Sequence, residues 1–337
     1  MLQTKWIIRL LTALLICAAA GGAFVYYQFT EFRQHPARVD AGQMLFKISP
    51  GQSLETIAIR LEKDGIITNQ RFFIWLAMLE KADKKLQAGE YLLSGSQSPD
   101  ALLTTLLSGK VRLYKLTIPE GLTITEIAGR IEKAGYCSRQ AFIELCNDPQ
   151  VVASFHIKGK SLEGFLYPDT YFFPGQTDCR TVAEAMVDRF KTVFTEEWRT
   201  RAKALGMNVY EVVTLASIIE KETGDASERP VIASVFHNRL KKKMRLESDP
   251  TVIYGIKNFD GNIRRIHLRT VTPYNTYQIK GLPAGPIANP GALAIKAALY
   301  PAETDYLFFV SKKDTTHYFS KTIKEHNRAV RKYQLNR

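Results

Sequence analysis

The segment ISPGQSLETIA at residues 48–58 recurs as IPEGLTITEIA at residues 118–128, 70 positions further along the chain. In each copy a short alternating strand enters a Pro/Gly turn, and the hydroxyl of Ser53 or Thr123 can then cap a helix. Only the second copy fits a capping box, because Glu126 follows its capping residue at the third helical position. An internal strand–helix repeat therefore organises residues 44–158.

Each copy predicts a strand followed by an amphipathic helix, which Gly65 or Gly135 ends in a left-handed conformation. The same patterning predicts further elements, in chain order: a strand at 88–93, a helix from Ser98 to Leu106, an ordered turn-rich loop at 160–175, a helical stretch from Thr181 to Leu205, helices at 208–223 and from Arg229, a strand at 305–310 and a basic helix at 323–333. These elements predict an α+β fold in which strand–helix modules precede a helix-rich domain with β elements.

The N-terminal segment has the composition of a membrane span. Leu10 to Tyr27 contains no charged residue, and its 18 residues extend about 27 Å as a helix, near the thickness of a bilayer core. Lys5 and Arg9 precede it, so we expect residues 1–9 in the cytoplasm, an anchor at 10–29, a linker at 30–43 and the rest outside. The alternative is a signal peptide cleaved near the small residues 18–22, which also exports the chain.

Charge and cysteine content constrain the partners of the exported part. The chain has a net charge of +13, of which the first 29 residues carry +2 and the exported part +11. A basic exported part suits anionic partners such as lipid head groups or the carboxylates of wall peptides, and nucleic acid is a poor candidate outside the membrane. Cys137, Cys146 and Cys179 form an odd exported set, which cannot be a complete disulfide framework. A Cys137–Cys146 bridge and free buried thiols both remain open. No spacing resembles a metal site.

The predicted helix at 208–223 carries the candidate chemistry. Val209, Val213 and Glu220 fall on one helix face, so Glu220 is a carboxyl group on an apolar side, whereas Glu222 lies about 200° further round and should face water. Desolvation and the negative end of the helix dipole would both raise the pKa of Glu220. A carboxylic acid that stays protonated near neutral pH can donate a proton to a glycosidic oxygen. The alternative is a half-buried glutamate paired with a nearby Arg or Lys.

Several segments, taken in order, resemble one family. They are ASIIEKET at 216–223, VFHNRL at 235–240, SDPTVIYG at 248–255, YNTY at 274–277 and GLPAGPIANPG at 281–291. Together they resemble the endolytic murein transglycosylase (MltG/YceG-like) family over essentially the whole chain, with His237 as one departure. The strand–helix unit at the first repeat also resembles the LysM-like module of wall-binding proteins, although a generic packing unit would show the same pattern. This organisation divides the chain into a LysM-like region at 44–158 and a catalytic domain at 159–337.

The resemblance implies a lytic reaction on peptidoglycan, with Glu220 as the catalytic residue. Protonated Glu220 would donate to the oxygen between MurNAc C1 and GlcNAc C4, then take the proton of the MurNAc 6-hydroxyl as a 1,6-anhydro ring closes. No metal or organic cofactor is required. The candidate substrate contacts are polar side chains of the downstream motifs: Asn238, Arg239, Asp249, Tyr274, Asn275 and Tyr277. The resemblance also implies that the protein acts in the periplasm, at the cytoplasmic membrane, where it would terminate nascent strands. It further implies binding to synthases of the penicillin-binding class.

Two other functions fit parts of this pattern. A hydrolase would use Asp249 or Glu222 as a second carboxylate, and its products would carry reducing ends one water heavier than anhydro ends. A membrane-anchored scaffold that binds peptidoglycan and recruits wall synthases would share the exported location, the repeat and the basic charge. The chemistry expected of Glu220 distinguishes the enzyme from the scaffold.

Overall fold

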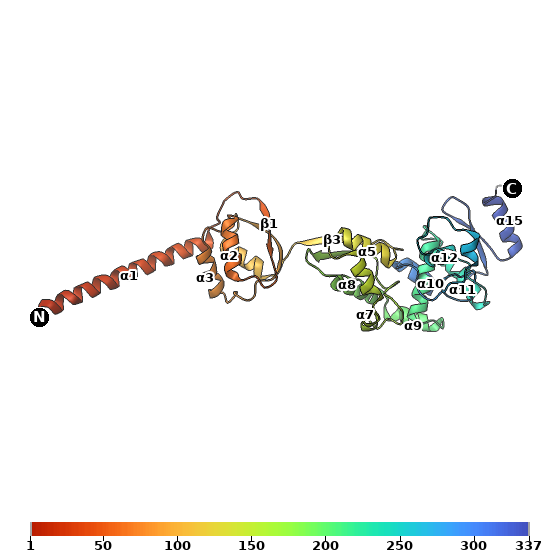
Figure 1. Cartoon of the computed structure of the whole chain (residues 1–337), viewed down its shortest axis with the longest axis horizontal. Helices are drawn as coiled ribbons and strands as arrows, with labels where there is room; N and C mark the ends of the chain where they lie inside the picture. The colour runs from red at the N-terminus through yellow and green to blue at the C-terminus, as the bar shows by residue number, and fades with distance from the viewer. Residues whose placement is uncertain (1, 336–337) are drawn as a thin grey trace. The chain divides into compact units, whose positions relative to one another are not determined.

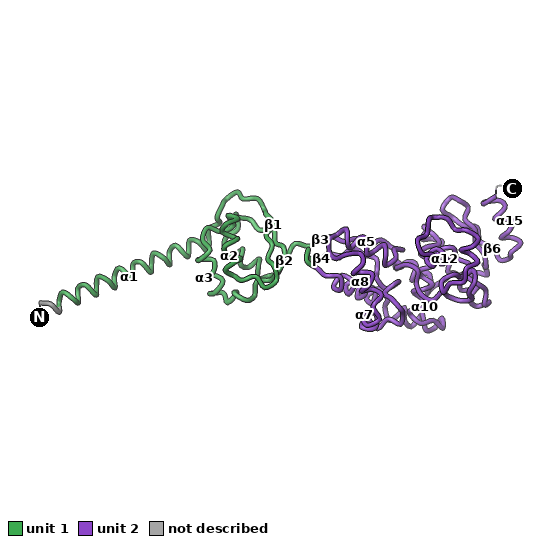
Figure 2. Tube along the Cα trace, in the orientation of Figure 1, with its two compact units in different colours: residues 1–114, 174–176 green, residues 115–173, 177–337 purple. Residues whose placement is uncertain are grey.

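The computed structural model describes residues 2–335 and divides the chain into two compact units (Figure 2). Unit 1 comprises residues 1–114 and 174–176, and unit 2 comprises residues 115–173 and 177–337. Three residues lie outside the described part of the chain: Met1, at the start of the predicted tail, and the last two residues of the predicted catalytic region. The division places the second repeat copy in the same compact unit as the region from 159 onward.

The N-terminal helix α1, Leu2–Gln34, is one continuous helix (Figure 1). Within its stretch Lys5–Gln34, an 18-residue window has a mean hydropathy of 2.1, and the helix is long enough to cross a membrane, which fits a single-pass anchor; a signal sequence would meet the same criteria. Residues 30–34, expected in a linker, belong to this helix. The reason is that Phe29 and Phe32, three residues apart, are buried in the core of unit 1.

Unit 1 is built from strand–helix units around a single core. Its remaining elements are β1 Gln43–Ile48, α2 Leu54–Lys63, α3 Gln70–Leu79, β2 Gly89–Ser94 and α4 Pro99–Leu107. β1 and β2 pair antiparallel with Phe46 opposite Tyr91, and both rings are buried. As predicted, Ser53 caps α2, and Gly65 has a positive φ of 69° at its end.

The second repeat copy begins with β3 Leu113–Thr117, whose first two residues fall in unit 1, and continues in unit 2 with α5 Ile124–Lys133. Thr123 and Glu126 form the predicted capping box, and Gly135 has the expected positive φ of 81°. β3 pairs with β4, Thr170–Pro174, in a segment that was expected to be a loop. The chain between them forms α6, Arg139–Asn147, and α7, Pro149–Ser154.

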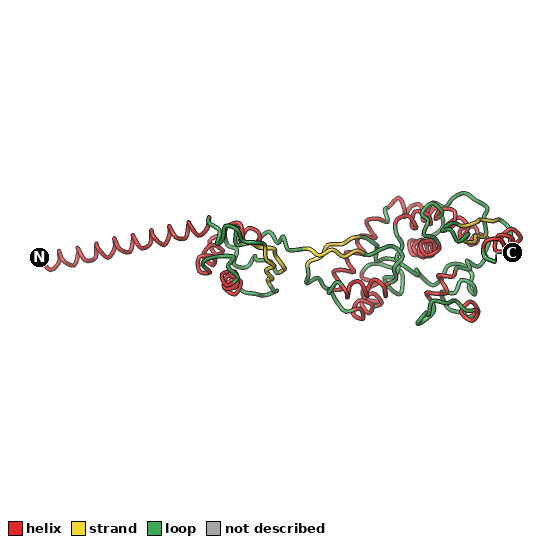
Figure 3. Tube along the Cα trace, turned by 90° about the horizontal axis from the view of Figure 1, so that it is seen from above, coloured by secondary structure: helices red, strands yellow, loops and turns green. Residues whose placement is uncertain are grey.

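The rest of unit 2 is helix-rich, with short paired strands (Figure 3). Its elements are α8 Cys179–Val193, α9 Glu196–Ala204, α10 Val209–Glu222, α11 Arg229–Lys241, α12 Asp249–Tyr254, α13 Arg265–Arg269, α14 Ala292–Leu299, β5 Phe308–Ser311, β6 His317–Ser320 and α15 Ile323–Tyr333. β5 and β6 pair antiparallel, with Phe309 opposite Phe319. The mixture of helices and strands confirms the predicted α+β class.

The disulfide of unit 2 joins Cys137 to Cys179, with their Cα atoms 5.7 Å apart. A Cys137–Cys146 bridge is therefore wrong. The Cys146 side chain lies on the core-facing side of α6 and is fully buried as a free thiol, whereas Cys137 lies before that helix and meets the start of α8.

Candidate functional site

Helix α10 lies in the core of unit 2 and is buried around its whole circumference from Val212 to Ile219. Asn208 caps it, and Asn208 and Glu211 form a capping box. Because α9, α11, α12 and α14 all pack against this helix, the face opposite the predicted apolar stripe does not meet water. Glu220 and Glu222, at its C-terminal end, therefore both start from a desolvated environment.

Glu220 forms an ion pair within the protein. Its Oε1 lies 2.6 Å from Nη2 of Arg229, and its Oε2 accepts a hydrogen bond of 2.9 Å from the backbone N–H of Gly291. Its side chain is 5% exposed and that of Arg229 is 8% exposed. Burial raises the pKa of Glu220, while the Gly291 hydrogen bond and the Arg229 charge oppose that rise. This is the arrangement expected of the alternative, an acid held by a neighbouring cation.

Glu222, the last residue of α10, has a different environment. Its carboxylate accepts a short hydrogen bond from the Ser248 hydroxyl. Burial raises the pKa of Glu222 to about 7; the nearby Asp249 carboxylate adds to the rise, and the Ser248 bond and the Arg239 charge oppose it. The expectation that Glu222 faces water is wrong, because the segment that carries Ser248 and Asp249 packs over this end of the helix.

Two cavities meet at Glu222. One, of about 440 Å³, has walls from the α10–α11 loop and from β5 and β6, and the other, of about 340 Å³, has walls from α11, α12 and α15. Glu222 and Phe309 line both cavities, whereas Glu220 lines neither. An acid with a pKa near 7 that borders two cavities is suited to donate a proton to a glycosidic oxygen bound there.

Three of the predicted substrate contacts line the 340 Å³ cavity: Arg239, Asp249 and Tyr277. The Tyr277 hydroxyl donates to Asp249 Oδ1 over 2.8 Å, and burial, the largest cause, raises the pKa of Tyr277. Arg239 is 8% exposed and directs its Nη1 to the Leu246 carbonyl and to Glu247, each at 3.0 Å. Arg239 therefore builds the wall of the cavity, and Asp249 and Tyr277 supply its polar groups.

The other three predicted contacts lie away from Glu222. Asn238 donates its amide to the carbonyls of Thr304 and Tyr306, at 2.8 and 3.0 Å. Asn275 is 1% exposed and donates to three backbone carbonyls between residues 267 and 270. Tyr274 packs edge-on against Tyr254 with ring centroids 4.8 Å apart. These groups hold backbone segments or rings in place.

Comparisons with known proteins identify the family of the chain. Residues 46–332 match the model of the YceG-like family. The chain belongs to the YceG-like family. It is 34% identical over 330 residues to a Bacillus subtilis (strain 168) protein named endolytic murein transglycosylase, with 93% of this chain and 90% of that protein covered.

Two further relatives extend the YceG-like comparison. A protein of the same name from Streptococcus pneumoniae (strain D39) is 29% identical over 349 residues, and the match covers 93% of this chain and 62% of that longer protein. Among solved structures, the putative yceG-like protein lmo1499 from Listeria monocytogenes matches with a TM-score of 0.60 and 35% identity, covering 86% of this chain and all of that one. The likeness therefore extends over most of the chain.

The sequence analysis of this YceG-like chain did not single out Glu163. Its carboxylate is buried and accepts hydrogen bonds from the Ile124 N–H, the Tyr254 hydroxyl and, at 2.8 Å, the Asn289 amide. Burial raises the pKa of Glu163 to about 7. Glu163 lies between Leu162 and Gly164 in a turn-rich apolar segment, and this position was the one feature of the sequence that could have indicated a buried acid. Through Asn289 it fixes the loop whose Gly291 contacts Glu220.

Glu228 and His317 form a pair that the sequence also did not indicate, and His317 lines the 440 Å³ cavity of the YceG-like site. Glu228 Oε2 lies 2.7 Å from His317 Nδ1, and its Oε1 accepts the backbone N–H of His317 at 2.9 Å. Since 89 residues separate the partners, no local sequence pattern connects them.

Proposed function

We propose that this chain is an endolytic murein transglycosylase that cleaves the MurNAc–GlcNAc bond within peptidoglycan strands, with Glu222 as its acid and base. The observation that carries the proposal is the position of Glu222, with a pKa raised to about 7, between two adjoining cavities. The names of the relatives supply the substrate class.

In this mechanism protonated Glu222 donates its proton to the glycosidic oxygen, and the bond from MurNAc C1 to that oxygen breaks. The Asp249 carboxylate beside it stabilises the positive charge that develops at C1. The Glu222 carboxylate then takes the proton of the MurNAc 6-hydroxyl, whose oxygen bonds to C1. The products are a terminal 1,6-anhydro-MurNAc and a free GlcNAc 4-hydroxyl, and Glu222 ends protonated as it began.

The family motif predicts Glu220 as the catalytic acid, and that assignment stays a prediction. The contacts of Glu220 favour a different role. Both of its oxygens are occupied, by Arg229 and by the Gly291 N–H. One turn earlier, Ser217 Oγ accepts the N–H of Ile287 at 3.0 Å. Ser217 and Glu220 thus fasten the loop at 281–291 to α10, and we propose that Glu220 positions this loop.

The test compares Glu222→Gln with Glu220→Gln on uncrosslinked glycan strands, with the products weighed by mass spectrometry. We expect wild type to release fragments with anhydro ends and Glu222→Gln to release none. Reducing ends, one water heavier, would instead indicate the hydrolase with Asp249 as the second carboxylate. If Glu222→Gln still cuts strands and Glu220→Gln is folded but inactive, Glu220 is the catalytic acid. If the folded wild-type protein cuts nothing, the alternative function is favoured, a membrane-anchored scaffold that binds peptidoglycan and recruits wall synthases.

We propose that helix α1 is a single-pass anchor in the cytoplasmic membrane and that the chain after this anchor lies in the periplasm. Lys5 and Arg9 before the apolar stretch support that orientation. A reporter that is active only in the periplasm, fused after the C-terminus, should be active, and the same reporter before Met1 should not. The reverse pattern would overturn the orientation.

A LysM-like role is proposed for the repeat units. The order β1–α2–α3–β2, with antiparallel outer strands, supports this role for the first copy. We expect it to hold glycan, so that a chain with this region deleted would cut strands with a raised KM. Termination of nascent strands and contact with penicillin-binding synthases belong to the same proposal, and crosslinking in growing cells would test the contact.

A further inference from the structure

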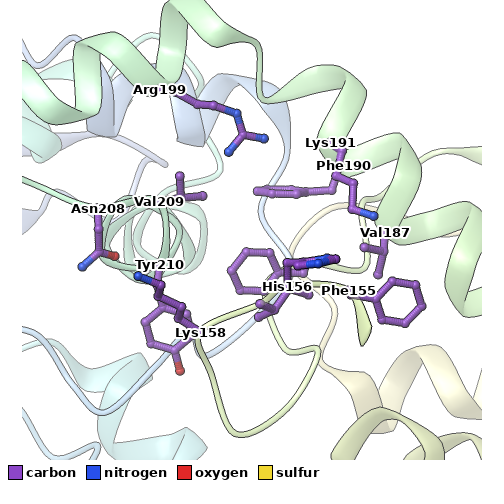
Figure 4. Close-up of a pocket in the computed structure, with 12 residues that line it drawn as sticks. Phe155, His156, Lys158, Val187, Phe190, Lys191, Arg199, Asn208, Val209 and Tyr210 are labelled. Carbon is purple, nitrogen blue, oxygen red and sulfur yellow. The ribbon is translucent and has the colours of Figure 1, made fainter. Parts of the chain in front are cut away.

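A third cavity, of about 510 Å³, lies in unit 2 at the other end of α10 from Glu222 (Figure 4). Its lining combines four rings with four basic side chains: Phe155, Phe165, Phe190 and Tyr210, and His156, Lys158, Lys191 and Arg199. No acidic residue belongs to this lining. The cavity is lined from the α7–α8 region, α8, α9 and the first turn of α10, so every wall belongs to one compact unit.

The positive charge of this cavity is not neutralised by its surroundings. Among the described residues, no acidic oxygen lies within 4.0 Å of Lys158 or His156. Lys191 and Arg199 each pair with an acid one turn away on the same helix, at 3.0 and 3.7 Å, but those acids are 68% and 79% exposed. Exposed pairs of this kind contribute little and are readily exchanged for another anion.

The wall that carries His156 and Lys158 has a defined conformation. His156 has a positive φ of 62°, which a non-glycine residue keeps only where its surroundings impose it. Gly159 lies so close to Tyr210 that an added Cβ would be 2.6 Å from its ring. On the floor, the Lys191 ammonium lies 5.4 Å from the centroid of the Phe155 ring. In Figure 4 the Arg199 side chain points from the opposite wall toward the rings of Phe190 and His156.

We propose that this cavity binds the carboxylates of a peptidoglycan stem peptide on the strand that Glu222 cuts. The inference rests on the function proposed above. Tyr210 and Glu222 are 12 residues apart on one helix, about 18 Å at 1.5 Å per residue. Because α10 is buried between these two ends, a glycan strand that reaches both would run over the surface of unit 2. Stem peptides carry carboxylates and small apolar side chains, which match the basic and aromatic halves of the lining.

The consequence is a preference for strands that still carry their peptides. A stem held in this cavity would fix one MurNAc relative to Glu222, because α10 connects the two positions rigidly. Peptide-bearing strands should therefore bind more tightly than strands stripped of peptides by an amidase. The cavity adds binding affinity and takes no part in the bond cleavage.

The test measures binding, so that it does not depend on cutting. Full-length Glu222→Gln chain in detergent is titrated with a fluorescently labelled synthetic stem peptide that carries free carboxylates, and anisotropy gives the Kd. Adding Lys158→Gln and Arg199→Gln together should weaken binding about tenfold, since both remove charged hydrogen-bond donors. The matched control adds Arg130→Gln and Lys133→Gln, which remove the same charges from the exposed end of α5, and should leave the Kd unchanged.

Three outcomes would overturn the proposal. An equal loss in the control variant would indicate diffuse attraction to a basic protein. Equal binding of the fully amidated stem peptide would remove the role of its carboxylates. If the Lys158/Arg199 variant lost binding to phosphatidylglycerol vesicles and not to the stem peptide, the cavity would face a lipid surface instead. Stem binding by a wild-type chain that cuts nothing would defeat the proposed function and leave this site standing.

Discussion

At the scale of single residues, two glutamates separated by one lysine have opposite surroundings. Glu220 meets Arg229 and the Gly291 N–H, whereas Glu222 meets a hydroxyl and another carboxylate and opens on two cavities. An acid bound to a buried cation must break that pair before it can donate a proton, while an acid with a pKa near 7 exchanges its proton at working pH. These contacts favour Glu222 for the proton transfer proposed above.

The first prediction separates the two glutamates by stability. Glu220→Gln leaves Arg229 buried without its counter-charge and should lower the free energy of unfolding by about 3 kcal/mol. Burial disfavours the ionised form of Glu222, so replacing it with the neutral Gln in Glu222→Gln should not lower stability, while it should abolish cutting. Urea unfolding monitored by circular dichroism, together with the cutting assay on each folded variant, checks both. Equal destabilisation by the two substitutions would contradict this division.

The second prediction concerns pH. Glu222 must be protonated to donate, and burial raises its pKa to about 7, so the cutting rate should fall as pH rises through about 7. Ser248→Ala removes a hydrogen bond that stabilises the carboxylate, which should raise the pKa and move the decline to higher pH. Asp249→Asn removes a neighbouring negative charge and should move it lower. Initial rates measured across neutral pH give the shifts. If the rate declines at the same pH in both variants as in wild type, a group other than Glu222 causes the decline.

At the scale of elements, local pattern predicted those with a cap, one apolar face and a defined stop. The helix at 323–333 was predicted with the bounds of α15, and the capping box of α5 was predicted from Thr123 and Glu126. The sequence of α3, QRFFIWLAML, is apolar on nearly every side, so it showed no helical period. The predicted stretch 181–205 is two helices, because Thr195 caps α9 and ends the continuity.

The candidate site was only partly predictable, because sequence patterns report local structure and not tertiary packing. A helical period shows which residues share a face, but it does not show whether the opposite face meets water. For α10 it does not, and Glu222 was therefore placed in solvent. The partners of Glu222 lie on α12 and its preceding loop, at least 26 residues further along, and folding alone brings them together. Asp249 and Tyr277 were found because their motifs resemble a family.

The third prediction belongs to the loop that packs against α10. Gly164 has a φ of +86°, and an added Cβ would lie 2.6 Å from Pro286 and 2.7 Å from Val213. Gly206, in the same unit, has a φ of +72° and open space around it. Gly206→Ala should cost about 1 kcal/mol from backbone strain alone, and Gly164→Ala clearly more, because the clash adds to the strain. Thermal unfolding of both variants compares them; equal costs would mean that the packing relaxes.

At the scale of the whole molecule, the chain combines an apolar N-terminal helix, a first compact unit whose core includes the end of that helix, and a second unit that contains Glu222. Phe29 pairs edge-on with Phe72 at 5.7 Å, so the end of the apolar helix is part of folded structure. Cleavage after residue 22 would retain that contact, so the contact fits both an anchor and a signal sequence. The disulfide gives an independent indication of the compartment.

The fourth prediction uses this disulfide. The Cys137–Cys179 bond closes a loop of 42 residues, which should stabilise unit 2 by about 3–4 kcal/mol, and such bonds persist in oxidising compartments outside the cytoplasm. Chain from membranes, denatured without reductant and treated with a maleimide, should therefore label at Cys17 and Cys146 alone. A chain lacking residues 2–22 stays in the cytoplasm and should label at all three of its remaining cysteines. Cys146→Ser should lower each count by one. Labelling of Cys137 and Cys179 in the membrane-derived chain would mean that the bond does not form there, and would remove this support for export.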